Sequence, residues 1–197
     1  MTKHVICISA LTLLTGAAGL LATTAAPAAP AAIAAEGAFK VDPVHSSVVF
    51  RIRHATSFFY GRFNQVSGSF DLNAADPTKS SLEVSVKTES IDSNNSKRDQ
   101  HLKSQDFFSA TEFPAITFKG KDFKKSADNK WEVKGDLTLH GVTKPVTIAV
   151  EDTAAGAGGG LEAKFAIKRS DYGMGFMSDK GLGDEVTIMV GLEGGKK

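Results

Sequence analysis

The residues that could support metal or nucleophilic chemistry are scattered along this chain. Four histidines lie far apart and lack the close paired spacing of a zinc site; they are His45, His54, His101 and His140. No Gly-x-Ser-x-Gly segment marks a nucleophilic serine, and no glycine-rich phosphate loop opens a helix. We therefore expect no metal site and no catalytic residue.

The carboxylates and the single thiol likewise give no sign of a catalytic or metal site. Asp184 and Glu185 are adjacent, and on a strand they face opposite sides of the sheet, so they would not share a proton. The single cysteine, Cys7, lies in an apolar N-terminal run. The chain that follows has no disulfide, thiolate nucleophile or cysteine metal ligand.

The charge balance argues against a nucleic-acid partner. The chain has 197 residues and a formal net charge of +1, with 23 lysines and arginines against 22 acidic residues. Loss of Lys3 with a leader would make the remainder neutral. A neutral protein has no broad attraction for phosphate backbones or anionic membranes.

The N-terminus has the pattern of a secretory signal. Lys3 and His4 precede an uncharged apolar or small-residue run at 5–21, and alanines and prolines follow to residue 35. Ala32 and Ala34 fit a cleavage signal, with the bond after Ala35 or an earlier cut at 22–26 as alternatives. An uncleaved membrane anchor is a further alternative, although the run is marginal for a span of about 20 residues. We expect an exported, periplasmic protein with no stable membrane span after processing.

Alternation with period two dominates the chain from residue 39 onward. It predicts half-buried strands, because successive side chains on a strand face opposite sides. The patterned runs lie at 48–54, 61–72, 82–86, 116–118, 131–139, 146–150, 161–167 and 186–192. Turn residues separate them at 76–77, 126–130, 140–141 and 154–160. About eight strands without long helices predict an all-β sandwich or barrel.

One segment, 91–108, breaks the alternation. Ser93 or Asn94 is a candidate N-cap for a short helix near residues 95–104. Leu102 is its one large apolar residue, so the helix should be mostly exposed. We expect it to lie across one end of the barrel, held by Phe107 and Phe108.

Four segments together resemble the YceI family of periplasmic proteins, in the family's order. They are VDPVHSSVVF at 41–50 with Ile52, His54, Gly61 and Phe63; IDSN at 91–94 with RDQHLKS at 98–104 and DFF at 106–108; GDLTLHGVTKPV at 135–146; and Ile167, RSDYGM at 169–174 and GDEV at 183–186. Each motif alone is weak. Four motifs in register, covering nearly everything after the leader, are specific.

The resemblance implies an all-β fold, an eight-stranded antiparallel lipocalin-like barrel formed by residues 36–197 after a leader at 1–35. It also implies export, frequent homodimerisation and no agreed catalytic activity. No cofactor is implied; the ligand would be a polyisoprenoid, an isoprenoid quinone or a related amphiphilic lipid in the lumen. An eight-stranded barrel is wide enough for one small ligand.

The inward faces of the strands, with nearby aromatic and methionine residues, supply candidate ligand-binding residues for the lumen. They are Phe50, Ile52, His54, Phe63, Val84, Val86, Phe107, Phe108, Ile116, Phe118, Leu137, Leu139, Phe165, Met174 and Phe176. Met174, together with Met177, would adapt the rim to an irregular ligand. The alternative is that these residues fill a dry core. His54 has its own alternative as a hydrogen-bonded core or rim residue.

Arg98, His101 and Arg169 are candidates for the ligand head group. Arginine offers a rigid fork of donors, and histidine can donate to an anion or a carbonyl. Each has a structural alternative. Arg98 with Asp99 could brace the short helix, and Arg169 could pair with Asp171 or Asp184.

Three functions are compatible with these observations. The leading hypothesis is a periplasmic carrier or reservoir that transports, stores or protects a long-chain amphiphile. The second is an enzyme that acts on a lipid-derived substrate at the barrel mouth, using Arg98, Asp99 and His101. The third is an assembly module in which the barrel is only a scaffold.

Overall fold

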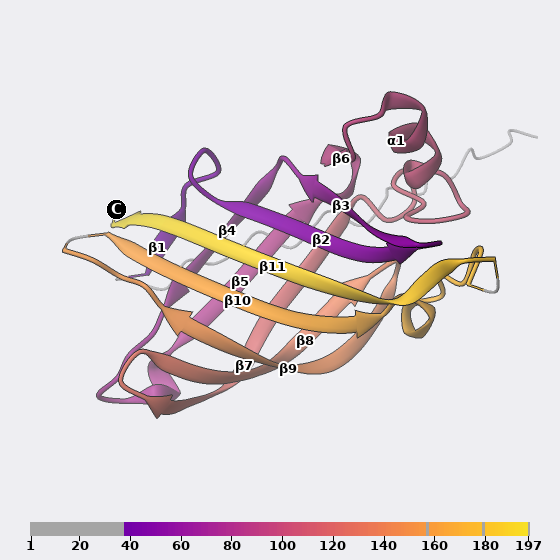
Figure 1. The fold of residues 1–197 in the computed structure, drawn as a ribbon. Coiled ribbons are helices and arrows are strands. Elements are labelled where there is room, and N and C mark those ends of the chain that lie inside the picture. Colours follow the sequence, from indigo (N-terminus) through magenta and orange to yellow (C-terminus); the bar gives the residue numbers. More distant parts are fainter. Residues whose placement is uncertain (1–37, 157, 179, 197) are drawn as a thin grey trace, which may run out of the picture. The chain divides into compact units, whose positions relative to one another are not determined.

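The computed structural model describes residues 38–156, 158–178 and 180–196, which form one antiparallel sheet and one helix (Figure 1). The strands are β1 (Phe39–Val41), β2 (Ser47–His54), β3 (Ser57–Phe63), β4 (Val66–Asp71), β5 (Ser81–Lys87), β6 (Ile91–Asp92), β7 (Ala115–Ala127), β8 (Lys130–Leu139), β9 (Val142–Asp152), β10 (Gly159–Lys168) and β11 (Leu182–Lys196). The helical elements are α1 (Ser96–Lys103) and the 3-10 turns η1 (Pro77–Lys79), η2 (Thr88–Ser90) and η3 (Arg169–Tyr172).

The sheet closes into an eight-stranded barrel, as the family resemblance implies. Neighbouring strands follow the order β1, β4, β5, β7, β8, β9, β10 and β11, and β11 pairs again with β1. The remaining strands extend this ring. β2 follows β1 along the same edge of β11, β3 pairs with β2, and β6 pairs with β3 at Arg62 and Phe63.

Side-chain contacts fix residues 42–46, which connect β1 to β2 and which we call the bulge. The Asp42 carboxylate accepts a hydrogen bond from the Val44 amide at 2.8 Å and contacts Nδ1 of His45 at 2.8 Å. The Ser46 hydroxyl accepts from the Glu193 amide at 3.0 Å and so ties the bulge to β11. His45 therefore contacts the same carboxylate that holds the Val44 amide.

The hairpin between β8 and β9 forms at the predicted turn. His140 and Gly141 both have positive φ, 51° and 72°, which is the geometry of the two-residue turn that matches strand twist. A Cβ atom at residue 141 would lie 2.5 Å from the Phe113 ring, so glycine is required there for space as well as for φ. Nδ1 of His140 is 3.1 Å from the carbonyl oxygen of Tyr172, which joins this turn to η3.

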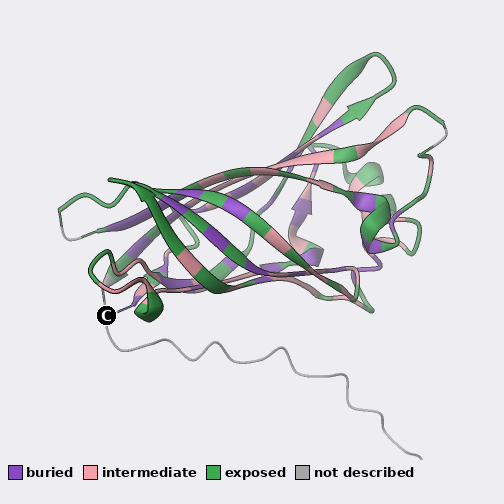
Figure 2. Cartoon of the chain, turned by 90° about the horizontal axis from the view of Figure 1, so that it is seen from below, coloured by how far each residue is buried: buried purple, intermediate pink, exposed green. Residues whose placement is uncertain are grey.

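One end of the barrel is packed with side chains. Trp131 and Val133 are 2% and 0% exposed, and the Phe39 and Phe70 rings stack with centroids 5.5 Å apart. Along the strands, buried and exposed residues alternate (Figure 2). The packed end forms a floor, and we call the other end, where α1 lies, the mouth (Figure 1).

The helix α1 begins one residue later than the sequence suggests. Asn95 is the N-cap, and its side chain accepts from the Arg98 amide at 3.0 Å. The candidates Ser93 and Asn94 are therefore wrong. Asn94 has φ of 60° and so takes the left-handed conformation before the cap, and Ser93 is buried and binds Asp99 instead.

The sequence pattern missed β1, the two-residue β6 and the first half of β3, and it treated the end of β3 and all of β4 as one run, 61–72. β1 is three residues long, too short to show a period, and the first half of β3 reads Ser-Phe-Phe-Tyr, in which three aromatic residues hide the alternation. The predicted leader at 1–35 lies outside the described residues. Among those described, no helix has the length and hydropathy needed to span a bilayer.

The contact between Asp42 and His45 predicts a raised pKa for the His45 ring. The hydrogen bond to Asp42, followed by the negative charges of Asp42 and Glu193, raises the pKa of His45 above its usual 6.5, so its imidazolium persists to higher pH. An NMR titration of the His45 ring should show this, and Asp42→Asn should lower the pKa because it removes the largest contribution. Asp128→Asn, in a distant turn, should leave the His45 titration unchanged. Equal His45 pKa values in the wild type and Asp42→Asn would contradict the assigned contact.

Candidate functional site

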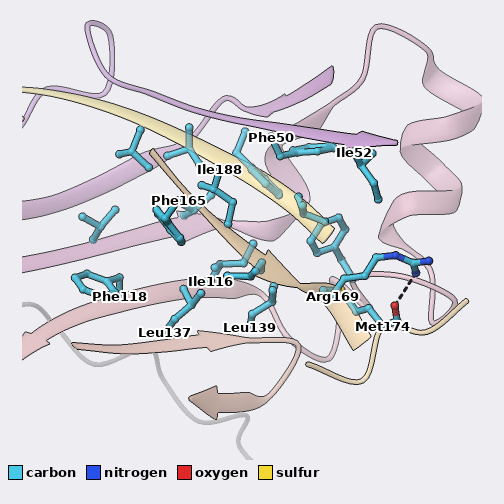
Figure 3. Close-up of a pocket in the computed structure, with 18 of the residues that line it drawn as sticks. Phe50, Ile52, Ile116, Phe118, Leu137, Leu139, Phe165, Arg169, Met174 and Ile188 are labelled. Atoms are coloured by element: carbon cyan, nitrogen blue, oxygen red, sulfur yellow. Dashed lines mark hydrogen bonds between the residues drawn. The ribbon is translucent and has the colours of Figure 1, made fainter. Parts of the chain in front are cut away.

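A cavity of about 380 Å³ lies inside the barrel. Side chains from strands all round the barrel point into it, including Phe50, Ile116, Phe165 and Ile188 (Figure 3). Its lining is almost entirely aliphatic and aromatic. A volume of this size lies within the usual range of about 300–1,000 Å³ for small-ligand sites.

The cavity is unfilled toward the mouth. The residues of β10 and β11 that point into the lumen are only partly buried; they include Phe165, Ile167, Val186, Ile188 and Val190. Their free surface faces the lumen, not a neighbouring side chain. The exposed residues His54, Arg98 and His101 also line the cavity, so it reaches solvent at the mouth. The alternative of a completely filled core does not apply to this half of the barrel.

A row of aromatic rings leads from α1 into the lumen. The Phe108 ring packs edge-on against Phe63 at 5.6 Å, Phe63 lies 5.9 Å from Phe50, and Phe50 lies 6.3 Å from Phe59. Gly61 makes room for this row, because a Cβ atom there would lie 2.3 Å from the tip of Phe50. The rings form a continuous apolar wall from the mouth to the middle of the barrel.

Arg98 lies over Phe59, at one end of this row of rings. Its Cζ atom lies 4.2 Å from the centre of the Phe59 ring. Its Nε donates to the Ser93 hydroxyl at 2.9 Å and its Nη2 to the Ser93 carbonyl at 2.6 Å. Ser93 in turn donates from its amide and its hydroxyl to Asp99. The bracing role predicted for Arg98 and Asp99 is present, and Nη1 of Arg98 has no partner among the described residues.

His101 belongs to a cluster in which two surface segments meet. Its Nε2 is 2.8 Å from the Asp106 carboxylate. Its ring packs edge-on against Phe107 at 5.1 Å and Phe176 at 5.5 Å, and these two rings are 5.3 Å apart. Phe107 follows α1 and Phe176 follows η3, so the cluster joins the helix to the segment 173–178.

Arg169 holds that segment from inside. It is 3% exposed, and all five of its N–H donors are used. They bind the carbonyls of Gly183, Met174, Phe176 and Leu182 and the hydroxyl of Ser178, at 2.6–3.3 Å; Figure 3 shows the contact with Met174. Burial lowers the pKa of Arg169, and the negative charge of Asp184 opposes this.

The two carboxylates predicted as partners of Arg169 bind other groups and form no ion pair with it. Asp184 accepts from the Ser170 amide at 2.9 Å and from the Ser170 hydroxyl at 2.8 Å, which together lower its pKa. Asp171 pairs with Lys144 at 3.3 Å. The buried guanidinium is thus solvated by carbonyl dipoles instead of a paired anion.

Most predicted lumen residues line the cavity. They are Phe50, Ile52, His54, Phe63, Val84, Val86, Phe107, Phe108, Ile116, Phe118, Leu137, Leu139, Phe165 and Met174. Phe176 does not line it; the side chain is 39% exposed and packs on the outer side of His101 and Phe107. Arg98, His101 and Arg169 all line the cavity, but Arg169 has no donor left for a head group.

The structure adds lining residues that the prediction omitted. Most occupy period-two positions of the patterned runs, and that period was the signal that could have found them; they include Val48, Leu82, Ile148, Val150, Leu161, Ala163, Ile167, Val186, Ile188, Val190 and Leu192. Phe59 was hidden by its aromatic neighbours. Within the described ranges, no group of three histidine or acidic side chains could hold a metal ion.

The chain is similar to proteins of one family. The YceI-like domain matches residues 39–194. Protein YceI of Shigella flexneri is 36% identical over 166 residues, covering 79% of this chain and 85% of that protein. A UPF0312 protein of Vibrio cholerae is 38% identical over 160 residues, with 78% and 83% covered.

Solved structures share the fold. BcnA of Burkholderia cenocepacia has a TM-score of 0.74 at 25% identity, covering 78% of this chain and 98% of that one. The Campylobacter jejuni YceI protein has a TM-score of 0.62 at 28% identity, with 70% and 84% covered. A polyisoprenoid binding domain from Saccharophagus degradans, with a TM-score of 0.65 at 16% identity, covers 80% and 97% and shows the fold alone.

The Arg169 contacts predict a large effect on stability. Arg169→Met should lower the free energy of unfolding by about 2–4 kcal/mol, because it leaves several carbonyls without donors. Urea denaturation, followed by the fluorescence of the single tryptophan, Trp131, would measure it. Lys168→Met, the exposed neighbour, should change stability by less than about 0.5 kcal/mol. Equal midpoints for the two variants would contradict the role given to Arg169.

Proposed function

We propose, on the premise that this chain belongs to the YceI family, that its barrel holds the apolar tail of a long-chain amphiphile. The ligand would be a polyisoprenoid, an isoprenoid quinone or a related lipid, and the role would be transport, storage or protection. The observation that carries the proposal is the unfilled apolar cavity that reaches solvent beside Arg98 and His101. The proposed role is binding, without a covalent step.

The energetics favour an oily tail in this site. Burial of about 300 Å² of apolar surface contributes about 7 kcal/mol at about 25 cal/mol per Å². That gain offsets much of the association cost, which starts at about 4 kcal/mol. Hydrophobic transfer is non-directional, so the lumen can accept tails that differ in detail. An aromatic and aliphatic wall suits the methyl-branched surface of an isoprenoid.

The two polar residues at the mouth would meet the head group. Nη1 of Arg98 is free to donate, while Ser93 holds the rest of the guanidinium in place. The bond from Nε2 of His101 to Asp106 leaves Nδ1 on the other side of the ring. A carbonyl, hydroxyl or phosphate head could be recognised here. Arg169 is excluded from this role because its donors are occupied.

We also propose that the protein works outside the cytoplasm. The support is the signal-like pattern of residues 1–35, together with the family resemblance. An isoprenoid tail needs shelter from water wherever it leaves a membrane. A binding protein in an aqueous compartment such as the periplasm would supply that shelter.

The first test is extraction of the purified protein with organic solvent, followed by mass spectrometry. We expect one isoprenoid-type lipid per chain, released on unfolding. The same extraction of a variant with a filled lumen provides the control. Protein that is folded and carries no lipid, and that binds none from an added panel of prenyl alcohols and quinones, would refute the proposal.

A substitution pair tests whether the tail lies in the lumen. Ala163 lines the cavity on β10, and Ala166 is exposed on the opposite face of the same strand. Ala163→Phe should weaken binding of a prenyl quinone about tenfold, since loss of about 60 Å² of tail contact costs about 1.5 kcal/mol. Ala166→Phe should leave the affinity unchanged. Titration calorimetry would measure both, and equal affinities would place the ligand outside the barrel.

A further inference from the structure

The hairpin of β2 and β3 carries exposed aromatic residues on its outer face. Phe58 and Tyr60 are 45% and 55% exposed. Phe58 lies directly opposite Arg53 across the hairpin, and Tyr60 lies opposite Arg51. Large exposed aromatic side chains that lie opposite arginines are unusual on a surface in contact only with water.

The two arginines of this face have no acidic partner. Cζ of Arg51 lies 4.0 Å from the centre of the Phe58 ring and Cζ of Arg53 lies 5.5 Å from it, so both cations pack on one ring. Neither forms an ion pair with a described carboxylate, whereas Lys79, Lys103, Lys119, Lys121 and Lys144 all do. Nε of Arg51 is buried without a hydrogen-bond partner. The positive charge of this face is therefore uncompensated.

Acidic groups around the face are few. Glu185 lies in the bulge of β11 opposite Arg53 and makes no ion pair with it. Asp92 lies opposite Arg62 at the base of the hairpin; hydrogen bonds from the Asn94 amide and the Asn64 side chain lower the pKa of Asp92 most, and the charge of Arg62 lowers it further. Arg62 is thus partly compensated. The surface that lacks a partner consists of Arg51, Arg53, Phe58 and Tyr60, and we call it the hairpin face.

The hairpin face lies beside the mouth. His54 and Phe59 of the same hairpin line the cavity, and the hairpin reaches the end of the barrel where α1 lies (Figure 1). Since side chains alternate along a strand, one side of the hairpin faces the lumen and the other carries the hairpin face. A partner bound to this face would be next to the entrance of the cavity.

We propose that the hairpin face docks onto a membrane surface that contains anionic phospholipid. Guanidinium groups bind phosphates through paired donors, and tyrosine and phenylalanine insert at the level of the head groups. The face lines neither the cavity nor the groove that includes Lys103 and Glu112. An aromatic and cationic surface fits a lipid interface. Docking there would let a lipid tail pass between the bilayer and the mouth.

Vesicle co-sedimentation of the purified protein tests this proposal. We expect binding to vesicles of equal parts phosphatidylglycerol and phosphatidylcholine, weak binding to pure phosphatidylcholine, and loss of binding at high salt. The double variant Arg51→Gln, Arg53→Gln should weaken binding about tenfold or more, given the contribution of each cation near an anionic surface. The double variant Phe58→Ser, Tyr60→Ser should weaken it on both kinds of vesicle.

Lys124→Gln with Lys125→Gln is the matched control. It removes the same two positive charges from exposed positions of β7, near the floor, and should leave vesicle binding unchanged. Trp131 fluorescence verifies that every variant is folded. Because vesicle binding does not require an occupied cavity, its failure would not affect the proposed ligand.

Two results would overturn the proposal. The first is an equal loss of binding in the β7 control, which would show that net charge alone accounts for the effect. The second is self-association through the hairpin face. Among the described strands, none pairs with residues 57–61 of β3 on the side away from β2, so a second copy could pair there. Sedimentation of lipid-free protein would detect a dimer that the Phe58→Ser, Tyr60→Ser variant dissociates.

Discussion

The arrangement of this protein depends on incomplete filling of the barrel interior. An eight-stranded barrel has just enough room for its own side chains, so a lumen is kept open only if some positions remain unfilled. The floor is filled by Trp131, Val133 and Phe70. Nearer the mouth, the inward-facing side chains leave a cavity of about 380 Å³. The floor supplies packing that stabilises the fold. The mouth half exposes apolar surface inside the protein, which only an apolar ligand would cover.

Two arginines with different surroundings organise the mouth. Arg169 is buried, and its five donors bind Met174, Phe176 and Ser178 and the first two residues of β11, so it shapes the rim. Arg98 is exposed and is held by Ser93, and no described residue binds its Nη1 above the aromatic wall. The same side-chain chemistry therefore serves structure at one position and is available for recognition at the other. Burial and the supply of backbone carbonyls decide between them.

Much of the fold could be predicted from the sequence, because alternation gives both strand position and inward face. That is why Phe50, Ile116, Leu137 and Phe165 were identified as lining residues. The prediction was weaker where structure depends on contacts between distant segments. Phe176 packs on His101 and Phe107 from a different segment, and the partners of Arg169 are mostly backbone carbonyls, which leave no trace in the side-chain pattern. The unfilled volume was inferred from the family resemblance. Periodicity shows which side chains point inward, but not whether side chains from opposite sides of the barrel touch.

The most direct test of the central claim uses the single tryptophan as a reporter at the floor. Trp131 pairs with Val150, which lines the cavity, so a tail that fills the lumen should end close to the indole ring. A prenyl-type lipid with bromine at the end of its tail should quench Trp131 fluorescence with one-to-one saturation. The same lipid brominated at the head group should bind without quenching. Equal quenching by both, or binding without any quenching, would show that the tail does not enter the barrel.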